Sequence, residues 1–130
     1  MKIGRATESS ESFRVSDYAI DSDTHVVELG GEVDLYTAPA FKGRMAELLE
    51  EGRTDLVVDL SQVTFIDSAA LGVLVGGVKR LRPKGGSLGI VCTNQTIIGL
   101  LEVAGLDQVF PIHATVEAAL AGRRAGRGQS

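Results

Sequence analysis

One serine lies at a position where covalent modification of its hydroxyl could change binding to another protein. Residues 59–72, DLSQVTFIDSAALG, run from an apolar strand through a tight loop into the start of a helix, and Ser68 stands at that start. The backbone N–H groups of a helix's first turn lack intrahelical partners and carry partial positive charge, so a phosphate is electrostatically tolerated there. A plain helix-capping serine is the alternative. The pattern therefore marks Ser68 as a candidate phosphoacceptor.

Three aspartates and a threonine accompany this serine. Asp34 and Thr37 follow the second expected strand, and the helices after the two strands should begin on the same edge of the sheet. Asp34 could accept a hydrogen bond from the Ser68 region or pair with a basic residue of a partner; capping its own loop is the alternative. Asp67 could orient the serine or meet the modifying enzyme, or simply cap the helix. Asp59 is interpreted as a loop-anchoring acceptor at the end of a buried strand.

The chain lacks the residue patterns of common enzymes. There is no P-loop spacing, no Gly-x-Ser-x-Gly elbow and no cluster of His and Cys at metal-ligand spacing. His25 and His113 are expected to be structural or on the surface, and Cys92 to be a buried thiol. We therefore expect a protein that is not an enzyme and that needs neither cofactor nor metal.

Composition describes one acidic domain. The 130 residues carry a net charge of −4, and 44% of them are hydrophobic, which suffices for a single core. The acidic body argues against nucleic acid as a partner, because binding to phosphates needs a basic face. The basic run Lys79–Lys84 is interpreted as cations at a helix C-terminus. One cysteine, no signal-like start and no apolar run near the roughly 20 residues of a membrane helix predict a cytoplasmic location without membrane insertion.

The first half of the chain predicts a hairpin and a helix. Residues 15–20 and 24–33 read as two antiparallel strands around a polar turn. Thr37 offers an N-cap hydroxyl to a first helix, and Gly52 suits the left-handed position after it. Residues 56–60 are almost continuously apolar, as expected for a central strand that is covered on both faces.

The second half alternates helices with strands. An apolar stripe from Leu71 to Leu81 predicts a second helix, which three interior glycines interrupt; we expect close packing against the sheet or a partner. Residues 87–92 form a further strand, Asn94 caps a third helix, and residues 109–112 form a short last strand. A terminal helix begins after Thr115.

These elements predict an α/β fold with one domain. Its mixed sheet has about five strands, mostly parallel through right-handed crossovers, with the N-terminal strand antiparallel at an edge, and about four helices cover it. Residues 1–12 are polar and are expected to be a flexible tail. The domain takes residues 13–121, and residues 122–130, which hold three arginines and no acid, form a disordered basic tail.

Three segments resemble one protein family. Residues 59–68 followed by Leu71-Gly72 are similar to the signature of bacterial anti-sigma-factor antagonists of the STAS domain family. Residues 31–38, GEVDLYTA, and residues 105–112 resemble two further blocks of that family, so the likeness spans about residues 14–120. The resemblance implies a STAS-like domain.

The resemblance also implies a partner-switching mechanism. Family members are phosphorylated on the serine after the aspartate, which is Ser68 in this sequence. By analogy, the unphosphorylated chain would bind an anti-sigma factor that is a GHKL-type serine kinase and would release the sigma factor. Phosphorylation of Ser68 would weaken that binding, and a serine phosphatase would reset it. The partner interface implied here consists of Asp34, Thr37, Asp67, Ala69, Ala70 and Gly72, and a homodimer is left open.

Two positions depart from the family pattern, and two other functions compete with it. Ala69 occupies a position that is often Ser or Thr, which leaves Ser68 as the single hydroxyl there, and Ala70 replaces the usual glycine, which could alter kinase contact.

A response-regulator receiver fits poorly, because such a domain requires an acidic pair after its first strand and a lysine near its last strand. A STAS accessory subunit of a membrane transporter, not regulated by phosphorylation, is the second alternative.

Overall fold

The chain folds around one five-stranded mixed sheet. This computed structural model describes the backbone of residues 13–128 and the side chains through Gly122; the tail expected at residues 1–12 lies outside the described residues. The strand order is β1-β2-β3-β4-β5, where β1 (Arg14–Ala19) is antiparallel to β2 (Thr24–Val33). The strands β3 (Asp55–Ile66), β4 (Ser87–Val91) and β5 (Ile112–His113) all pair in parallel. The predicted mixed sheet with an antiparallel edge strand is confirmed.

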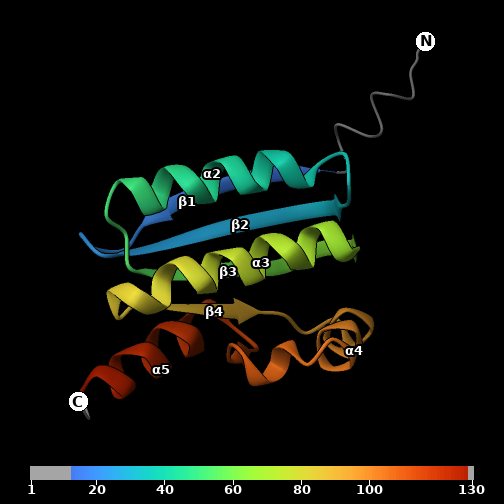
Figure 1. Ribbon diagram of the computed structural model, residues 1–130. Coiled ribbons are helices and arrows are strands. Elements are labelled where there is room, and N and C mark those ends of the chain that lie inside the picture. Colours follow the sequence, from blue (N-terminus) through green and yellow to red (C-terminus); the bar gives the residue numbers. More distant parts are fainter. Residues whose placement is uncertain (1–12, 129–130) are drawn as a thin grey trace.

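Helices lie on both faces of the sheet. The pair α2 (Ala38–Glu50) and α3 (Ser68–Leu81) lie side by side over one face, and α5 (Val116–Gly128) lies against the other. Alternation along β3 explains the two layers, because Leu56 and Val58 belong to the large core beneath α2 and α3, whereas Val57 packs with Ala119 of α5. The fourth long helix, α4 (Gln95–Val103), follows β4 (Figure 1). Two short 3₁₀ turns cover Arg82–Lys84 and Leu106–Gln108.

Most predicted helix ends are found where the sequence places them. Gly52 and Gly105 have φ of 92° and 76° after α2 and α4, as the left-handed position requires. The Asn94 side chain accepts from the N–H of Thr96 at 2.9 Å, so it caps α4. Thr115 Oγ1 accepts from an N–H of α5 at 3.0 Å. The last turns of α5 extend into residues 122–128, for which composition predicts disorder.

Two predicted strand ends are wrong. The central strand does not stop at Leu60 but continues to Ile66, because β2 keeps pairing with it after β4 has ended opposite Asp59. No loop therefore precedes Asp67, and Asp59 lies within the strand, where its carboxylate accepts from the Ser61 N–H at 2.9 Å. The last strand is Ile112–His113, shorter and later than expected, because a 3₁₀ turn and a bend occupy the preceding residues.

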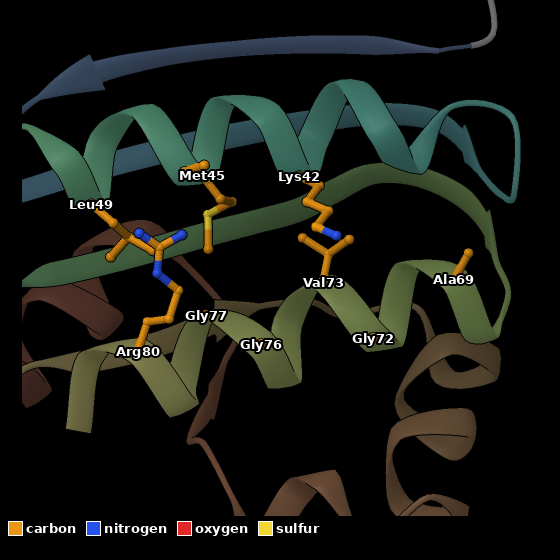
Figure 2. A pocket seen from close by; sticks show the side chains of 10 residues that line it. Lys42, Met45, Leu49, Ala69, Gly72, Val73, Gly76, Gly77 and Arg80 are labelled. Carbon is orange, nitrogen blue, oxygen red and sulfur yellow. The ribbon is translucent and has the colours of Figure 1, made fainter. Parts of the chain in front are cut away.

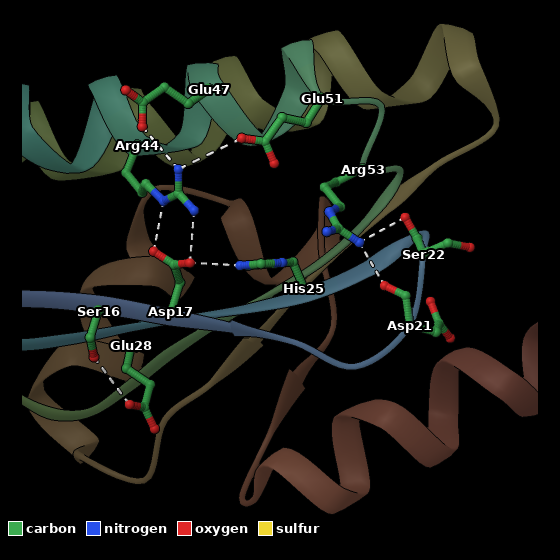
Figure 3. Close-up of polar contacts among 10 residues, drawn as sticks. All are labelled: Ser16, Asp17, Asp21, Ser22, His25, Glu28, Arg44, Glu47, Glu51 and Arg53. Atoms are coloured by element: carbon green, nitrogen blue, oxygen red, sulfur yellow. Dashed lines mark hydrogen bonds and ion pairs between the residues drawn. The ribbon is translucent and has the colours of Figure 1, made fainter.

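An ion-pair cluster ties the edge strand to α2 (Figure 3). The guanidinium of Arg44 on α2 donates two hydrogen bonds to the carboxylate of Asp17 on β1, at 2.7 and 2.9 Å. His25 Nε2 lies 2.7 Å from the same carboxylate, and His25 is 5% exposed, which fits its expected structural role. Hydrogen bonds from Arg44, partly offset by burial, lower the pKa of Asp17 from 3.8 to about 2. The cluster attaches the edge strand to the body of the fold.

The cysteine behaves as the sequence predicts. Cys92 is a free thiol that is 3% exposed, and burial raises its pKa.

Candidate functional site

The candidate residues meet at the edge of the sheet where β2 and β3 end. At this edge β2 leads into residues 34–37 and then α2, while β3 leads directly into α3 (Figure 1). The Asp67 N–H donates to the Val33 carbonyl at 3.3 Å, so the two strand ends are joined. Carboxyl ends of parallel strands share one edge of a sheet, which is why residues more than thirty positions apart come together.

Asp67 connects the two segments of this site. Its Oδ1 accepts from the N–H groups of Ala69 at 2.9 Å and Ala70 at 3.3 Å, so it is the N-cap of α3. Its Oδ2 accepts from the Leu35 N–H at 3.0 Å. One carboxylate thus fixes the helix start and the loop after β2 relative to each other.

Asp34 and Thr37 form a closed turn of their own. Asp34 Oδ1 accepts from the N–H groups of Tyr36 at 2.9 Å and Thr37 at 3.1 Å, so its loop-capping role is found. Within the described residues Asp34 makes no hydrogen bond to Ser68, against the expectation that it could. The expected N-cap bond from Thr37 is also wrong, because its hydroxyl accepts from the Asp34 N–H and donates to the Glu32 carbonyl, both at 2.9 Å.

Ser68 is the first residue of α3, and it is exposed. Its hydroxyl forms no hydrogen bond with any residue of the described part of the chain. The alternative in which Ser68 caps the helix is therefore wrong, because Asp67 does so. The hydroxyl can be modified without breaking a bond that holds the fold.

The backbone around Ser68 offers a phosphate less compensation than the sequence predicts. The N–H groups of Ala69 and Ala70 are already taken by the Asp67 carboxylate, and the Leu71 N–H donates to the Asp67 carbonyl at 3.2 Å. The same carboxylate would stand beside the new charge. A phosphate here would be stabilised only weakly by the helix terminus, so its charge would be directed outward.

The three small residues after Ser68 differ in exposure. Ala70 is 2% exposed and belongs to the core, so its methyl group does not reach the surface, and the expected partner contact through it is wrong. Ala69 is half-buried and Gly72 is exposed, and both lie on the side of α3 that faces α2.

Three large apolar side chains near this edge are exposed, and sequence reasoning identified two of them as possible interface contacts. Leu35, Tyr36 and Phe65 are 66%, 87% and 48% exposed. Tyr36 and Phe65 could be expected in the core or at the edge, and they lie at the surface. Leu35 was not identified, although an apolar pair in a loop after a strand is a usable signal. Exposed apolar side chains of this size are typical of binding surfaces.

Two absences apply to the described residues. In that part of the chain, no group of three or more His, Cys, Asp or Glu residues is arranged to hold a metal ion. None of the helices described there is both long and apolar enough to cross a membrane.

Known proteins share this fold and sequence pattern. The STAS domain family model matches residues 16–119. An anti-sigma-B factor antagonist of Bacillus subtilis is 36% identical over 91 residues, covering 70% of this chain and 83% of the relative. The anti-sigma-F factor antagonist RsfB of Mycobacterium tuberculosis is 33% identical over 102 residues, covering 78% and 83%. The crystal structure of an anti-sigma factor antagonist from Mycobacterium paratuberculosis superposes with a TM-score of 0.80 at 30% identity, over 88% of this chain and 96% of that one. The chain belongs to the STAS domain family.

Proposed function

We propose that this protein is an anti-sigma-factor antagonist whose partner binding is switched by phosphorylation of Ser68. The observation that carries the proposal is the exposed Ser68 hydroxyl, which makes no hydrogen bond within the described residues and follows the aspartate that caps α3. The names of its relatives support the antagonist role. In this proposal the chain is a phosphoacceptor in the cytoplasm and not an enzyme.

The unphosphorylated chain binds the anti-sigma factor through the edge around Ser68. The interface includes Asp34, Thr37, Asp67, Ala69 and Gly72, together with the exposed apolar side chains of Leu35, Tyr36 and Phe65. Aromatic side chains that become buried at the centre of an interface contribute most of its binding free energy. The two aspartates would pair with basic groups of the partner. The partner surface should therefore combine an apolar patch with positive charge.

Phosphorylation acts on the interface and not on the fold. A phosphate adds about 1.5 to 2 negative charges beside Asp67, whose carboxylate already accepts from the N–H groups of Ala69 and Ala70. Partner groups that fit closely around a neutral hydroxyl would meet this charge and its volume. A coupling of about 1–3 kcal/mol, or about 5–150-fold in affinity, is enough to exchange partners.

The other components of the switch follow from the same proposal. The anti-sigma factor is a GHKL-type serine kinase that phosphorylates Ser68, and a serine phosphatase restores the hydroxyl. Release of the sigma factor results when the antagonist occupies the anti-sigma factor.

The test uses purified chain, a kinase anti-sigma factor encoded in the same genome, and ATP. We expect one phosphate by intact mass on the unaltered chain, none on Ser68→Ala, and at least about fivefold weaker binding after modification. Thr64→Ala removes another exposed hydroxyl from β3 and should change neither result. Equal phosphate on the Ser68→Ala variant would exclude Ser68 as the acceptor, and unchanged affinity after modification would exclude the switch.

A second measurement tests the position of the interface. Tyr36→Ala should weaken binding of the unphosphorylated chain by about tenfold or more, because Tyr36 is the most exposed aromatic at the site. Tyr18→Ala is the matched control, since Tyr18 is 40% exposed but pairs with Val26 near the start of β2, away from the site. Equal losses in the two variants would place the interface elsewhere.

A further inference from the structure

A groove of about 420 Å³ lies between α2 and α3, the two helices that cover one face of the sheet (Figure 2). Met45 and Leu49 line it from α2, and Val73 lines it from α3. Its size lies within the range of about 300–1,000 Å³ that is typical of binding pockets. Gly72 and Gly76, which also line it, are exposed, so the groove opens to solvent.

On the α3 side, glycine backbone lines the groove, and packing within the domain does not require glycine at two of the three positions. A Cβ atom added at Gly72 or Gly76 would meet nothing within 4 Å, whereas one at Gly77 would lie 2.9 Å from Met45 Cε. The close packing expected for all three glycines is therefore found only at Gly77. A glycine inside a helix destabilises it by about 0.5–1 kcal/mol relative to alanine. Gly72 and Gly76 are four residues apart and lie on one face of α3, where they allow another backbone to come close.

The charged residues that line the groove are both positive. Lys42 reaches from α2 toward Val73, and Arg80 reaches from α3 toward Leu49 (Figure 2). No acidic residue lines the groove, and within the described residues neither cation forms an ion pair. Two cations beside an apolar floor are complementary to an apolar surface that is flanked by carboxylates.

We propose that the α2–α3 groove binds an acidic amphipathic helix of a partner protein. Apolar side chains spaced at i, i+3, i+4 and i+7 on that helix would pack on Val73 and on the exposed backbone at Gly72 and Gly76. Met45 and Leu49, each 2% exposed, form the floor beneath, and Glu or Asp residues of the docked helix would pair with Lys42 and Arg80. The bare strip at Gly72 and Gly76 lets the docked helix lie close to α3. This surface shares Ala69 and Gly72 with the interface proposed around Ser68, but the rest of its lining lies on α2 and farther along α3, and binding there does not require phosphorylation.

The probe for this site is an 18-residue helical peptide with leucine and alanine on one face and glutamate on both flanks. A matched peptide carries lysine at every glutamate position. Amide chemical shifts of the isotope-labelled chain report where each peptide binds. We expect the acidic peptide to perturb residues of α2 and α3 around the groove and to bind at least about tenfold more tightly than the basic one.

Two variants locate the contact. Gly76→Leu should abolish binding, because the new side chain fills the groove and the added Cβ clashes with nothing. Gly43→Leu is the control: Gly43 is an exposed glycine of α2 that also has open space around its Cβ position but does not line the groove. The double variant Lys42→Glu with Arg80→Glu should reverse the preference between the two peptides.

Several results would overturn this proposal. They are equal binding of both peptides, chemical-shift changes confined to elements other than α2 and α3, or unchanged binding by the Gly76→Leu variant. Dodecanoate is included as a small anionic amphiphile; if it binds the groove and the acidic peptide does not, the site takes small molecules. Groove shifts that grow with protein concentration alone would assign the surface to a second copy of the chain. These experiments use unphosphorylated protein and no kinase, so their failure would leave the Ser68 switch untouched.

Discussion

The ion-pair cluster on the edge strand gives a stability prediction whose size follows from a pKa. Asp17 has its pKa lowered from 3.8 to about 2, and its side chain is 17% exposed. A lowered pKa means that the ionised carboxylate is bound more favourably in the folded chain than the neutral acid is. The difference of nearly two pH units corresponds to about 2 kcal/mol of folding free energy. Asp17→Asn resembles the neutral acid, so it should destabilise the chain by about that amount at pH 7.

The pH dependence identifies the cause. This contribution is fully present above pH 3.8, where the unfolded chain's Asp17 is ionised, and it is lost as pH falls through the folded value of about 2. Near pH 3 roughly half of it should remain. The difference in stability between the unaltered chain and Asp17→Asn should therefore shrink between pH 4 and pH 2. Loss of a hydrogen bond independent of charge would give the same difference throughout.

Urea unfolding at constant sucrose concentration provides the assay, since sucrose keeps the acid form folded. Glu47→Gln is the control, because Glu47 also bonds to Arg44 at 2.9 Å but its side chain is 64% exposed. It should change the free energy of unfolding by less than about 0.5 kcal/mol at any pH. A pH-independent effect of Asp17→Asn, or an effect as small as that of Glu47→Gln, would refute the assignment of the lowered pKa to the Arg44 contact.

Three further predictions concern α3. Asp67→Ala should lower the free energy of unfolding in urea by about 1–2 kcal/mol, because the Asp67 carboxylate caps α3. The variant should also speed hydrogen exchange at the Leu35 amide, since the same carboxylate accepts from that N–H. Slow exchange at Leu35 in the variant would contradict this. Gly76→Ala should stabilise the chain by about 0.5–1 kcal/mol, while Gly77→Ala should not, since only the latter Cβ meets packed side chains. Phosphorylated Ser68 should leave the urea midpoint nearly unchanged, because its hydroxyl makes no bond within the described residues; a large downward shift would mean that the switch acts by unfolding.

The sequence predicts the layers of the fold well and the strand ends poorly. Alternation and capping residues are local signals, so the hairpin, the helix start at Asn94 and the stops at Gly52 and Gly105 are correct. The length of β3 is not a local property. Ser61 to Phe65 lack a continuous apolar pattern, and they form a strand because β2 supplies hydrogen-bonding partners along one side.

The candidate site was predicted in place but not in detail. Topology alone brings Asp34 and Asp67 to one edge of the sheet, because parallel strands end together. Which acceptor takes which N–H depends on distances of a few tenths of an ångström, and both aspartates are chemically suited to capping. Thr37 illustrates this, because its hydroxyl bonds to the backbone of its own turn and not to α2.

In the proposed switch, the bonds made by Asp67 give a reason why a phosphate on Ser68 would act on a partner and not on the fold. A switch that rearranges structure needs a bistable element, and here the loop after β2 and the start of α3 are held together by a single carboxylate. That carboxylate also occupies two of the first-turn N–H groups, those of Ala69 and Ala70, with which the helix could have bound the phosphate. The added charge would then have few favourable contacts inside the domain. The residue that rigidifies the site is thus the same one that leaves the charge of phosphoserine available at the surface.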